Sequence, residues 1–584
     1  MPSARLYRLI LSAMLVACLT SCVQESSSLR AGDETVVISI VGSNDIHGQF
    51  LPAGDRGGVT TLSGYVSALR TARANDGGVL LVDGGDMWQG TLESNLNEGA
   101  LMVAAFNALG YAASTIGNHE FDFGPAGPLA LPESSTDDPQ GNLKARASEA
   151  SFPLLAANLV DEATGEPVAW DNVQPSTMVD VAGVKIGIIG ILTSSTPHTT
   201  ISANFAGLRI DPLTDSIIRE ATKLRANGAS IVVVAAHAGG RCADYSDPND
   251  LSSCDLSREI LRVAGELPAG LVNHIVGGHE SFAIAHIVNG VVITAGTSYA
   301  RNFGRADFTL DRATGEVLDV TVFPPQPLCP WVEPGTQTCS WDEERRESLA
   351  TANYEGFPVV PDPAVAAIAD QAAAIAAEMK TEKLGTTLET AFTLDGNPES
   401  SLGNLITDIL QESLDADVSM LNVSGGLRAN LPAGDLTYGS VFEMFPFDNR
   451  VVILELTGAD LRKIVAKQAH NHLRRAGFSG MSVDVSCSDG RLDVTMRLSD
   501  GAEVQNDDRV RVAVNDFLAT RGDDILTPVM PDSGFDYVQD PRYIRDVIAD
   551  WFRRHRGALH AGQYDSADAR RWNLPESLPA TCKL

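Results

Sequence analysis

The sequence predicts an α/β fold with two domains, a layered N-terminal domain and a second, smaller α+β domain joined to it by a long helix. Three observations support this prediction. The chain has 584 residues, which is more than one hydrophobic core usually supports. Short β-branched runs alternate with Ala- and Leu-rich segments through its first half. An Ala-rich stretch then separates this half from a second set of strands and helices.

The composition is that of a folded protein with a large excess of acidic charge. Hydrophobic residues make up 44% and charged residues 20% of the chain, close to globular averages. The formal net charge is -32 at pH 7, which repels phosphate polymers and anionic lipid surfaces. This argues against nucleic acid polymers as partners, whereas a small anion can bind where cations gather locally.

The first 22 residues have the layout of an export signal. Two arginines precede an apolar stretch that is short for a membrane span, and small residues follow it. The stretch ends in "LTSC", which resembles the bacterial lipobox, in which the cysteine is acylated and becomes the new N-terminus. We expect residues 1–21 to be a signal peptide, Cys22 to carry a lipid and residues 22–35 to form a polar tether. The alternative is an ordinary export signal with a chance cysteine.

Cysteine usage also favours an oxidising compartment. Of eight cysteines, two lie in the export signal and six remain, an even number that favours three disulfides. Proximity along the chain gives two pairs, and the remaining cysteines form the third: Cys242 with Cys254, Cys329 with Cys339, and Cys487 with Cys582. None lies in a close C-x-x-C pair with histidines, which argues against a thiolate metal site.

The strands of the first domain lie between about residues 36 and 300. Their sequences are VVISIVG (36–42), GVLLVDGGD (78–86), VKIGIIGI (184–191), SIVVVAAHAGG (230–240), LVNHIVGGHE (271–280) and GVVITAG (290–296). Helical segments separate them, which predicts a layered α/β domain. Residues 305–323 are predicted to form a hairpin that closes this domain, which we expect to cover residues 36–342.

The Ala-rich stretch is predicted to be a bridge between the domains. It lies within residues 343–383 and is opened by Pro361 to Pro363, since proline is favoured in the first turn of a helix. A second α+β unit follows, and we expect it to cover residues 384–584.

Acidic and histidine residues of the first domain follow its strands. The motifs are SNDIHG (Asp45, His47), DGGDMWQG (Asp86), GNHEFDFG (Asn118, His119, Asp122), AAHAGG (His237) and GGHES (His279). Taken singly, each residue is more often a structural histidine or a turn aspartate. Together they occupy five strand-turn boundaries, and such strand ends converge in the crevice where open α/β sheets bind ligands. Oxygen and nitrogen donors without thiolates suit zinc, manganese or iron.

The order of these motifs resembles that of the calcineurin-like metallophosphatases, and specifically the bacterial periplasmic 5'-nucleotidase and UDP-sugar hydrolase family. The segments SLGNLITDIL (401–410), SGGLRANLPAGDLTYGSVFEMFPFDNRVV (424–452) and VNDFLATRGDD (514–524) are similar to the C-terminal substrate domain of that family. The resemblance covers about residues 36–560.

The resemblance implies a two-metal phosphohydrolase. One metal would be held by Asp45 and His47, the other by Asn118, His237 and His279, and Asp86 would bridge them. Two divalent ions such as zinc or manganese would share a hydroxide that attacks phosphorus in line with the leaving oxygen. His119 would face the phosphate as a cation or proton donor, and Asp122 would orient it and keep it protonated.

The resemblance also implies how the second domain binds substrate. Phe447 and Phe517 match a pair of aromatic rings that sandwich a nucleobase, with Asn449 and Asp523 as polar contacts and Arg428 on the phosphate. Stacking tolerates any base identity. The alternative is that both phenylalanines are ordinary core residues.

The chain departs from the family pattern at the first metal. The family usually has Gln or His two residues after the "GGH" histidine, where this chain has Ser281. Glu280, His286 or a water are the candidates to complete this metal's shell, and the metal would otherwise bind weakly.

Two further departures affect the substrate clamp. Pro398 stands where the family tends to carry arginine, and Val423 stands where it tends to carry asparagine, with Asn422 beside it. These changes bear on specificity for nucleoside monophosphates more than on hydrolysis.

The sequence therefore predicts an exported, lipid-anchored 5'-nucleotidase that faces the periplasm or the cell surface, with no protein partner and membrane contact only through its anchor. One alternative is a phosphoesterase for 2',3'-cyclic nucleotides, nucleotide sugars or another oxyanion ester. The other is a nucleotide-binding surface lipoprotein with weakened catalysis.

Overall fold

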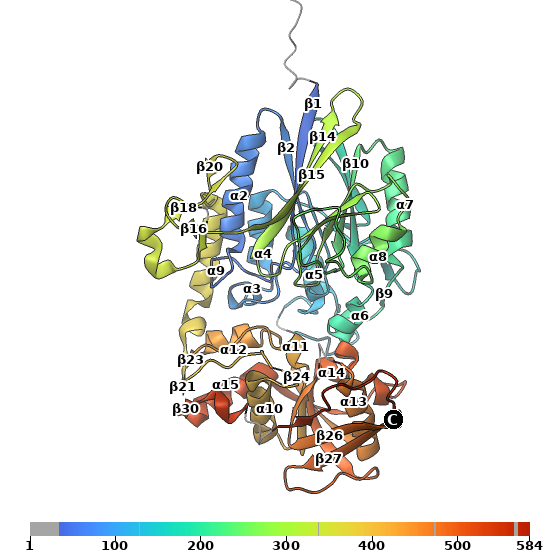
Figure 1. Ribbon diagram of the computed structural model, residues 1–584, viewed down its shortest axis with the longest axis vertical. Coiled ribbons are helices and arrows are strands. Elements are labelled where there is room, and N and C mark those ends of the chain that lie inside the picture. The colour runs from blue at the N-terminus through green and yellow to red at the C-terminus, as the bar shows by residue number, and fades with distance from the viewer. Residues whose placement is uncertain (1–33, 128, 337, 397, 472–474, 566–569) are drawn as a thin grey trace, which may run out of the picture.

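The computed structural model describes residues 34–584 apart from 128, 337, 397, 472–474 and 566–569. The predicted signal peptide and Cys22 lie outside the described residues. Two α/β units follow one another along the long axis of the molecule, and one long helix runs beside the first unit down to the second (Figure 1). This arrangement confirms the predicted fold class.

The first unit contains two sheets that face each other. The larger has the order β15-β14-β1-β2-β3-β4-β6, formed by β1 (Thr35–Ser43), β2 (Gly77–Asp83), β3 (Ala113–Thr115), β4 (Leu154–Leu155), β6 (Val173–Gln174), β14 (Asn302–Asp311) and β15 (Val317–Pro327). The other has the order β12-β13-β11-β10-β8-β7, formed by β7 (Ser176–Val181), β8 (Val184–Leu192), β10 (Ile231–His237), β11 (His274–Gly277), β12 (Ile284–Val288) and β13 (Val291–Ala295).

The β-branched runs of the central strands β1, β8 and β10 are buried almost throughout, because both faces of each sheet are covered there. Ile38, Ile188 and Val233 belong to one buried cluster between the sheets. Strands β1 and β2 run parallel, with Ile40 opposite Leu80, as do β10 and β11. The predicted hairpin is confirmed as β14 and β15, with Ala306 opposite Val322.

Helices cover the outer faces of the two sheets, with α2 and α7 on opposite sides of the unit (Figure 1). The helices of this unit are α2 (Gly58–Arg73), α3 (Leu92–Asn95), α4 (Ala100–Leu109), α5 (Gly141–Glu149), α6 (Thr196–Thr199), α7 (Leu213–Ala226) and α8 (Glu259–Glu266). Short strands lie at its edges: β5 (Leu159–Asp161), β9 (Leu208–Ile210), β16 (Trp331–Val332), β17 (Cys339–Ser340), β18 (Ala350–Thr351), β19 (Asn353–Tyr354) and β20 (Phe357–Pro358).

The predicted bridging helix is α9 (Pro363–Thr381). The Asp362 side chain caps it by accepting from the backbone N–H groups of Ala364 and Val365, and Pro363 occupies its first turn. The helix packs against α2, α3 and α4 of the first unit and against α12 (Tyr438–Met444) of the second. It therefore links the cores of both units.

The second unit is built on a five-stranded sheet of order β25-β22-β28-β24-β29. These strands are β22 (Val418–Leu421), β24 (Arg450–Thr457), β25 (Gly477–Ser479), β28 (Arg509–Asn515) and β29 (Val538–Tyr543). Helices α10 (Ser401–Ser413) and α15 (Ile544–His555) pack on one face and α13 (Gly458–Ala469) on the other. The remaining elements are α11 (Val423–Gly426), α14 (Asp516–Ala519), β21 (Lys383–Leu388), β23 (Gly434–Thr437), β26 (Met481–Ser488), β27 (Arg491–Leu498), β30 (Ala558–Leu559) and β31 (Trp572–Asn573). The exact residue limits of the two domains, 36–342 and 384–584, remain a prediction.

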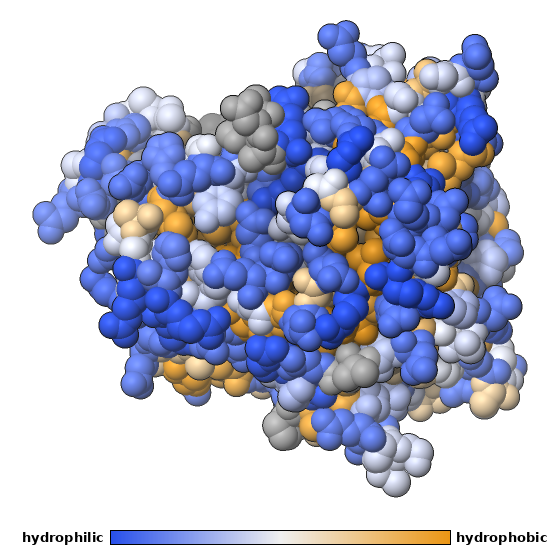
Figure 2. Space-filling model, turned by 90° about the horizontal axis from the view of Figure 1, so that it is seen from below, coloured by the Kyte–Doolittle hydropathy of each residue, from blue (hydrophilic) through white to orange (hydrophobic). Residues whose placement is uncertain are grey.

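The surface and the disulfides agree with the composition. Seen from the end of the second unit, the surface is largely hydrophilic with apolar atoms in between (Figure 2). All three predicted disulfides are present: Cys242–Cys254, Cys329–Cys339 and Cys487–Cys582. Within the described ranges, we find no helix with the length and apolar character to cross a bilayer.

Candidate metal centre and substrate cavity

A cavity of about 360 Å³ lies between the two units and is lined by residues of both. Strands β1, β2 and β3 are parallel neighbours in one sheet, and β10 and β11 are parallel neighbours in the other. The turns that follow these strands meet at the cavity, as expected for carboxyl ends of parallel strands. They bring together all six predicted metal-binding residues: Asp45, His47, Asp86, Asn118, His237 and His279.

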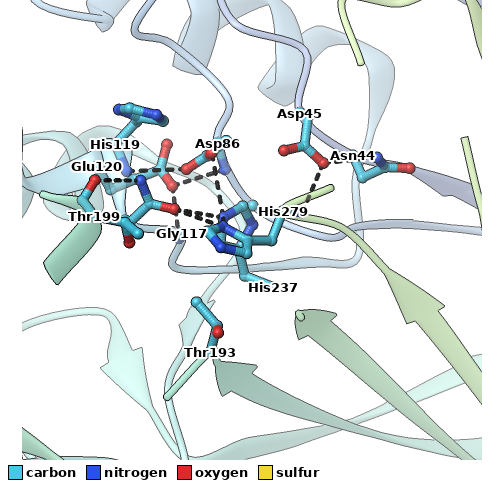
Figure 3. Close-up of polar contacts among 12 residues, drawn as sticks. Asn44, Asp45, Asp86, Gly117, His119, Glu120, Thr193, Thr199, His237 and His279 are labelled. Atoms are coloured by element: carbon cyan, nitrogen blue, oxygen red, sulfur yellow. Dashed lines mark hydrogen bonds and ion pairs between the residues drawn. The ribbon is translucent and has the colours of Figure 1, made fainter. Parts of the chain in front are cut away.

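The side chains of Asp86, His237 and His279 point toward one another (Figure 3). His237 Nε2 lies 3.2 Å from Asp86 Oδ2 and 2.9 Å from Asn118 Oδ1. His279 Nδ1 lies 2.9 Å from the same Asn118 oxygen. Side-chain donor atoms of Asp45, Asp86 and His237 all lie within 4.8 Å of one another. Such buried oxygen and nitrogen donors fit a divalent transition metal.

Backbone contacts fix which atoms face the cluster. His47 Nδ1 lies 2.8 Å from the Gln89 carbonyl, and His237 Nδ1 lies 2.8 Å from the Gly84 carbonyl. A carbonyl oxygen only accepts, so both Nδ1 atoms carry the proton and both Nε2 atoms are free to bind a metal. The amide of Asn118 donates to the Thr199 carbonyl at 2.8 Å, which turns its oxygen toward the histidines.

Four of these residues have a left-handed backbone although none is glycine. The φ angles are +48° at Asp45, +51° at His47, +58° at Asp86 and +71° at His279. Non-glycine residues in this region carry backbone strain of about 1–3 kcal/mol each and cluster at functional sites. Neighbouring turns hold them in place, because the Asp45 and His47 N–H groups donate to carbonyls of the Asp86 turn at 2.9 and 3.0 Å.

Glu120 organises this turn, a role that the sequence interpretation missed. Its buried carboxylate accepts from the N–H groups of Asp86 and Met87 at 2.8 Å each, and of Gly117 at 2.6 Å. The sequence feature that could have identified Glu120 is its position inside the motif GNHEFDFG. The motif thus supplies a residue that supports the site as well as residues that form it.

His119 and Asp122 form a close pair at the cavity. His119 Nδ1 lies 2.6 Å from Asp122 Oδ2, and the Thr200 hydroxyl donates to the other Asp122 oxygen at 3.1 Å. Burial alone would lower the pKa of His119, but the carboxylates of Asp122 and Asp86 raise it above its usual value. The arrangement therefore favours an imidazolium at the cavity wall.

The second unit supplies the opposite wall, which includes all five predicted substrate residues: Arg428, Phe447, Asn449, Phe517 and Asp523. The ring of Phe447 stacks against His119 with centroids 5.6 Å apart. Arg428 Nη2 lies 3.1 Å from His47 Nε2.

Two of these polar residues also hold their own wall together. The Asn449 amide donates to Asp516 Oδ1 at 3.0 Å, and Asp523 Oδ2 accepts from the Asn422 amide at 2.8 Å. Asn422 lines the cavity, whereas its neighbour Val423 does not. At the position where the family tends to carry asparagine, Val423 does not reach the cavity, and its neighbour Asn422 faces the cavity instead.

The structure separates the candidates for completing the first metal's shell. The Ser281 hydroxyl lies 2.9 Å from the Ser298 hydroxyl, and Glu280 lines the cavity while accepting from Arg258 at 3.0 Å. His286 lies elsewhere, fully buried on β12 beside Tyr245 and the Cys242–Cys254 disulfide. His286 is thereby excluded as the residue that completes the first metal's shell, which leaves Glu280 and a water as candidates.

Several other residues of the cavity region were not expected from the sequence, among them Tyr299, Arg241 and Phe282. The Tyr299 ring lies 4.8 Å from the His47 ring. Arg241 directly follows the motif AAHAGG, and Phe282 directly follows GGHES. Both line the cavity. The sequence feature that could have identified Arg241 and Phe282 is their position directly after motifs that carry predicted metal ligands.

The two-domain fold, with a cluster of oxygen and nitrogen donors between an α/β domain and a second domain, resembles that of the two-domain metallophosphatases. Residues 378–530 match the family model described as 5'-nucleotidase, C-terminal domain. The predicted resemblance to the 5'-nucleotidase family is thereby confirmed.

Individual relatives agree with this result. The chain is 25% identical over 543 residues to the 5'-nucleotidase of Vibrio cholerae, covering 88% of this chain and 90% of that protein. It is 26% identical over 515 residues to endonuclease YhcR of Bacillus subtilis. This match covers 84% of this chain but only 38% of that protein. The crystal structure of a 5'-nucleotidase precursor from Thermus thermophilus superposes with a TM-score of 0.67 at 22% identity, covering 90% of this chain and 97% of that one. That likeness shows the shared fold.

Proposed function

We propose that this protein is a metal-dependent phosphohydrolase that removes the 5'-phosphate of nucleotides. The observation that carries the proposal is the cavity itself: metal-type donors from five strand ends, all but His279 buried, lie on one side, and an arginine and two phenylalanines lie on the other. The 5'-nucleotidase names among the relatives support the same activity.

The donor cluster would hold two divalent ions, such as zinc or manganese. Asp45 and His47 would bind one ion, Asn118, His237 and His279 the other, and Asp86 both. When bound, two such ions generate a nucleophile from water at neutral pH and stabilise charge on the phosphoryl group. The buried Asp45 and Asp86 carboxylates support this reading, since burying two carboxylates side by side is costly without a compensating cation.

His119 would act on the phosphoryl group as a cation or proton donor. Its Nδ1 is committed to Asp122, so Nε2 is the nitrogen left for the substrate. Asp122 would keep the ring protonated and hold its orientation.

The second domain would bind the nucleotide. Arg428 would contact the phosphate, Phe447 and Phe517 would stack the base, and Asn449 and Asp523 would provide polar contacts. Stacking on aromatic rings contributes about 1–3 kcal/mol per base.

A substrate panel tests the proposal. Purified protein loaded with manganese, cobalt or zinc is assayed on nucleoside 5'-monophosphates, a 2',3'-cyclic nucleotide, a nucleotide sugar and an aryl phosphate. We expect the highest kcat/KM for the 5'-monophosphates and loss of turnover on chelation. A higher kcat/KM for another ester would change the proposed substrate but leave the proposed hydrolytic chemistry in place. Metal-dependent nucleotide binding without turnover would instead show that the protein is a nucleotide-binding protein and not an enzyme.

We also propose that the protein is exported and anchored through a lipid on Cys22. The lipobox-like motif supports this location, as does the cell wall protein Lmo0130 of Listeria monocytogenes among the relatives. Mass spectrometry of the mature N-terminus tests it, and a start at any residue other than an acylated Cys22 would reject the anchor.

A further inference from the structure

Asp516 and Asn449 form a buried pair in the wall that carries the predicted base-binding rings. The Asn449 amide donates to Asp516 Oδ1 at 3.0 Å. Asp516 directly precedes Phe517, and Asn449 follows Phe447 by two residues. We infer that Asp516 determines which group of Asn449 faces the cavity, and that it thereby selects bases that offer an N–H donor. This inference rests on the proposed function and deepens it by naming the kind of base.

The sheet of the second unit holds this pair in place. Strands β24 and β28 are antiparallel neighbours with Val451 opposite Asn515, and Asn449 and Asp516 lie within two residues of these positions. The Asn449 carbonyl also accepts from the Ile544 N–H at 2.9 Å. Because the backbone is fixed on both sides, the Asn449 amide can flip about its terminal bond but stays beside Asp516.

Asp516 can only accept hydrogen bonds from its two neighbours. Its Oδ1 accepts from the Asn449 amide, and its Oδ2 accepts from the Arg450 N–H at 3.1 Å. Burial raises the pKa of Asp516 to about 6, so above this pH its carboxylate is ionised and has no proton to donate. The NH2 group of Asn449 is therefore the group that must point at Asp516.

This orientation leaves the side-chain oxygen of Asn449 for a ligand. Asn449 lines the cavity, and among the residues that the structure describes none donates a hydrogen bond to its Oδ1. An amide oxygen accepts but cannot donate, so a base that places an amino group there gains a hydrogen bond. The stacking of a base on aromatic rings tolerates any base identity. The Asn449 oxygen therefore adds a selectivity that stacking lacks.

Two substrates that differ by one amino group test the inference. They are adenosine 5'-monophosphate and purine riboside 5'-monophosphate, which carries hydrogen in place of the 6-amino group. Their kcat and KM are measured on metal-loaded protein at about pH 8, where Asp516 is ionised. We expect KM to be about 3- to 10-fold lower for the adenosine compound at similar kcat, the effect of one net hydrogen bond to the bound base.

Asp516→Asn should remove this difference in KM. The new side chain has one oxygen, which must accept from the Arg450 N–H because that group can only donate. Its NH2 group then faces Asn449, which flips to accept and turns its own NH2 group toward the cavity. We expect the KM ratio of the two substrates to fall to about 1 or to reverse. Asn449→Ala should abolish the ratio too, and adding Asp516→Asn to that variant should change the ratio no further.

Asp484→Asn is the matched control. Asp484 also accepts from an asparagine amide, that of Asn573 at 3.0 Å, but on the sheet of β26 and β31 and outside the cavity. This variant should leave the KM ratio unchanged. Equal KM values in the wild type, an unchanged ratio in Asp516→Asn, or an equal loss of kcat/KM on an aryl phosphate would overturn the inference. Hydrolysis of 5'-monophosphates by the wild type would still support the proposed function.

The wild type offers a second test of Asp516 if Asp516→Asn does not fold. A protonated Asp516 can donate to Asn449, so the KM ratio should fall as the pH drops below about 6. The other titratable groups that face Asp516 are Arg450 and Tyr537, side chains that keep their charge state between about pH 5 and 8. A ratio that is the same at both ends of this range would overturn the inference. A wild type that hydrolyses neither nucleotide would overturn the proposed function together with it.

Discussion

Arg428 of the second domain donates a hydrogen bond from Nε to the hydroxyl of Tyr299 in the first domain, at 2.7 Å. Tyr299 is itself tied to the donor cluster, because its N–H donates to the Asp45 carbonyl at 2.7 Å. Its backbone is left-handed, with φ of +66°. The contact therefore connects the predicted phosphate-binding arginine directly to the turn that carries a predicted metal ligand.

We expect Tyr299→Phe to raise KM for nucleotides about 2- to 10-fold with little change in kcat, the usual effect of losing one net hydrogen bond. Steady-state kinetics measure the split. Tyr354→Phe is a matched control, since it also removes a hydroxyl that accepts from an arginine, Arg305, at 2.8 Å, but outside the cavity. Unchanged kinetics in Tyr299→Phe would show that Arg428 needs no positioning from the first domain.

His119→Asn should leave the metal content unchanged and lower kcat by about 10²- to 10⁴-fold, the contribution of a positioned acid or charge. Metal analysis and turnover are measured on the same sample. Wild-type turnover in this variant would remove His119 from the mechanism.

The contact between Asp122 and His119 predicts a shift in pH dependence. The carboxylate raises the pKa of His119, so the active imidazolium is present below this pKa and is lost as pH rises through it. In Asp122→Asn the pKa of His119 falls, and kcat should therefore begin to decline at a lower pH than in the wild type. Identical alkaline limbs of the two pH profiles would contradict this assignment.

Asp86→Ala should lose metal and activity together, because the proposed bridging carboxylate serves both ions. Asp319→Ala, at an exposed position on β15, is the control for loss of one carboxylate. Full metal content in Asp86→Ala would reject the dinuclear centre.

Phe517→Ala should raise KM for nucleotides about 5- to 150-fold, equivalent to losing roughly 1–3 kcal/mol of stacking. An aryl phosphate, which reaches the metals without the base-binding rings, should be hydrolysed nearly as before. Phe357→Ala, at an exposed position outside the cavity, serves as control. If both substrates suffer alike, Phe517 has a structural role, and if neither changes, the substrate is not held by its base.

Ser281→Gln should lower the concentration of added metal needed for half-maximal activity, because an amide oxygen is a better ligand than the Ser281 hydroxyl, which contacts Ser298. The readout is a metal titration of chelated protein. Two ions that survive prolonged chelation in the wild type would show that another residue, such as Glu280, completes the shell.

The strands, the bridging helix, the disulfide pairs and the donor residues were predictable from the sequence alone. Most of them depend on a local pattern: β-branched runs form buried strands, proline opens a helix, and a ligand such as Asp45 or His237 directly follows or ends its strand. The disulfide Cys487–Cys582, whose cysteines are 95 residues apart, followed only from pairing the other four cysteines first. Parallel strands bring such ends together whatever lies between them in the chain. For this reason, five separate motifs could be assigned to one site.

Tertiary structure decided which other side chains reach that site. Tyr299 and Arg428 are 129 residues apart and meet only because the domains pack across the cavity. His286 and Ser281 are five residues apart, yet the strand β12 directs His286 into the protein interior while Ser281 remains at the cavity. Arg241 and Phe282 face each other because two loops from neighbouring strands end on the same wall. Such contacts depend on side-chain direction and long-range packing, which no local pattern of residues encodes.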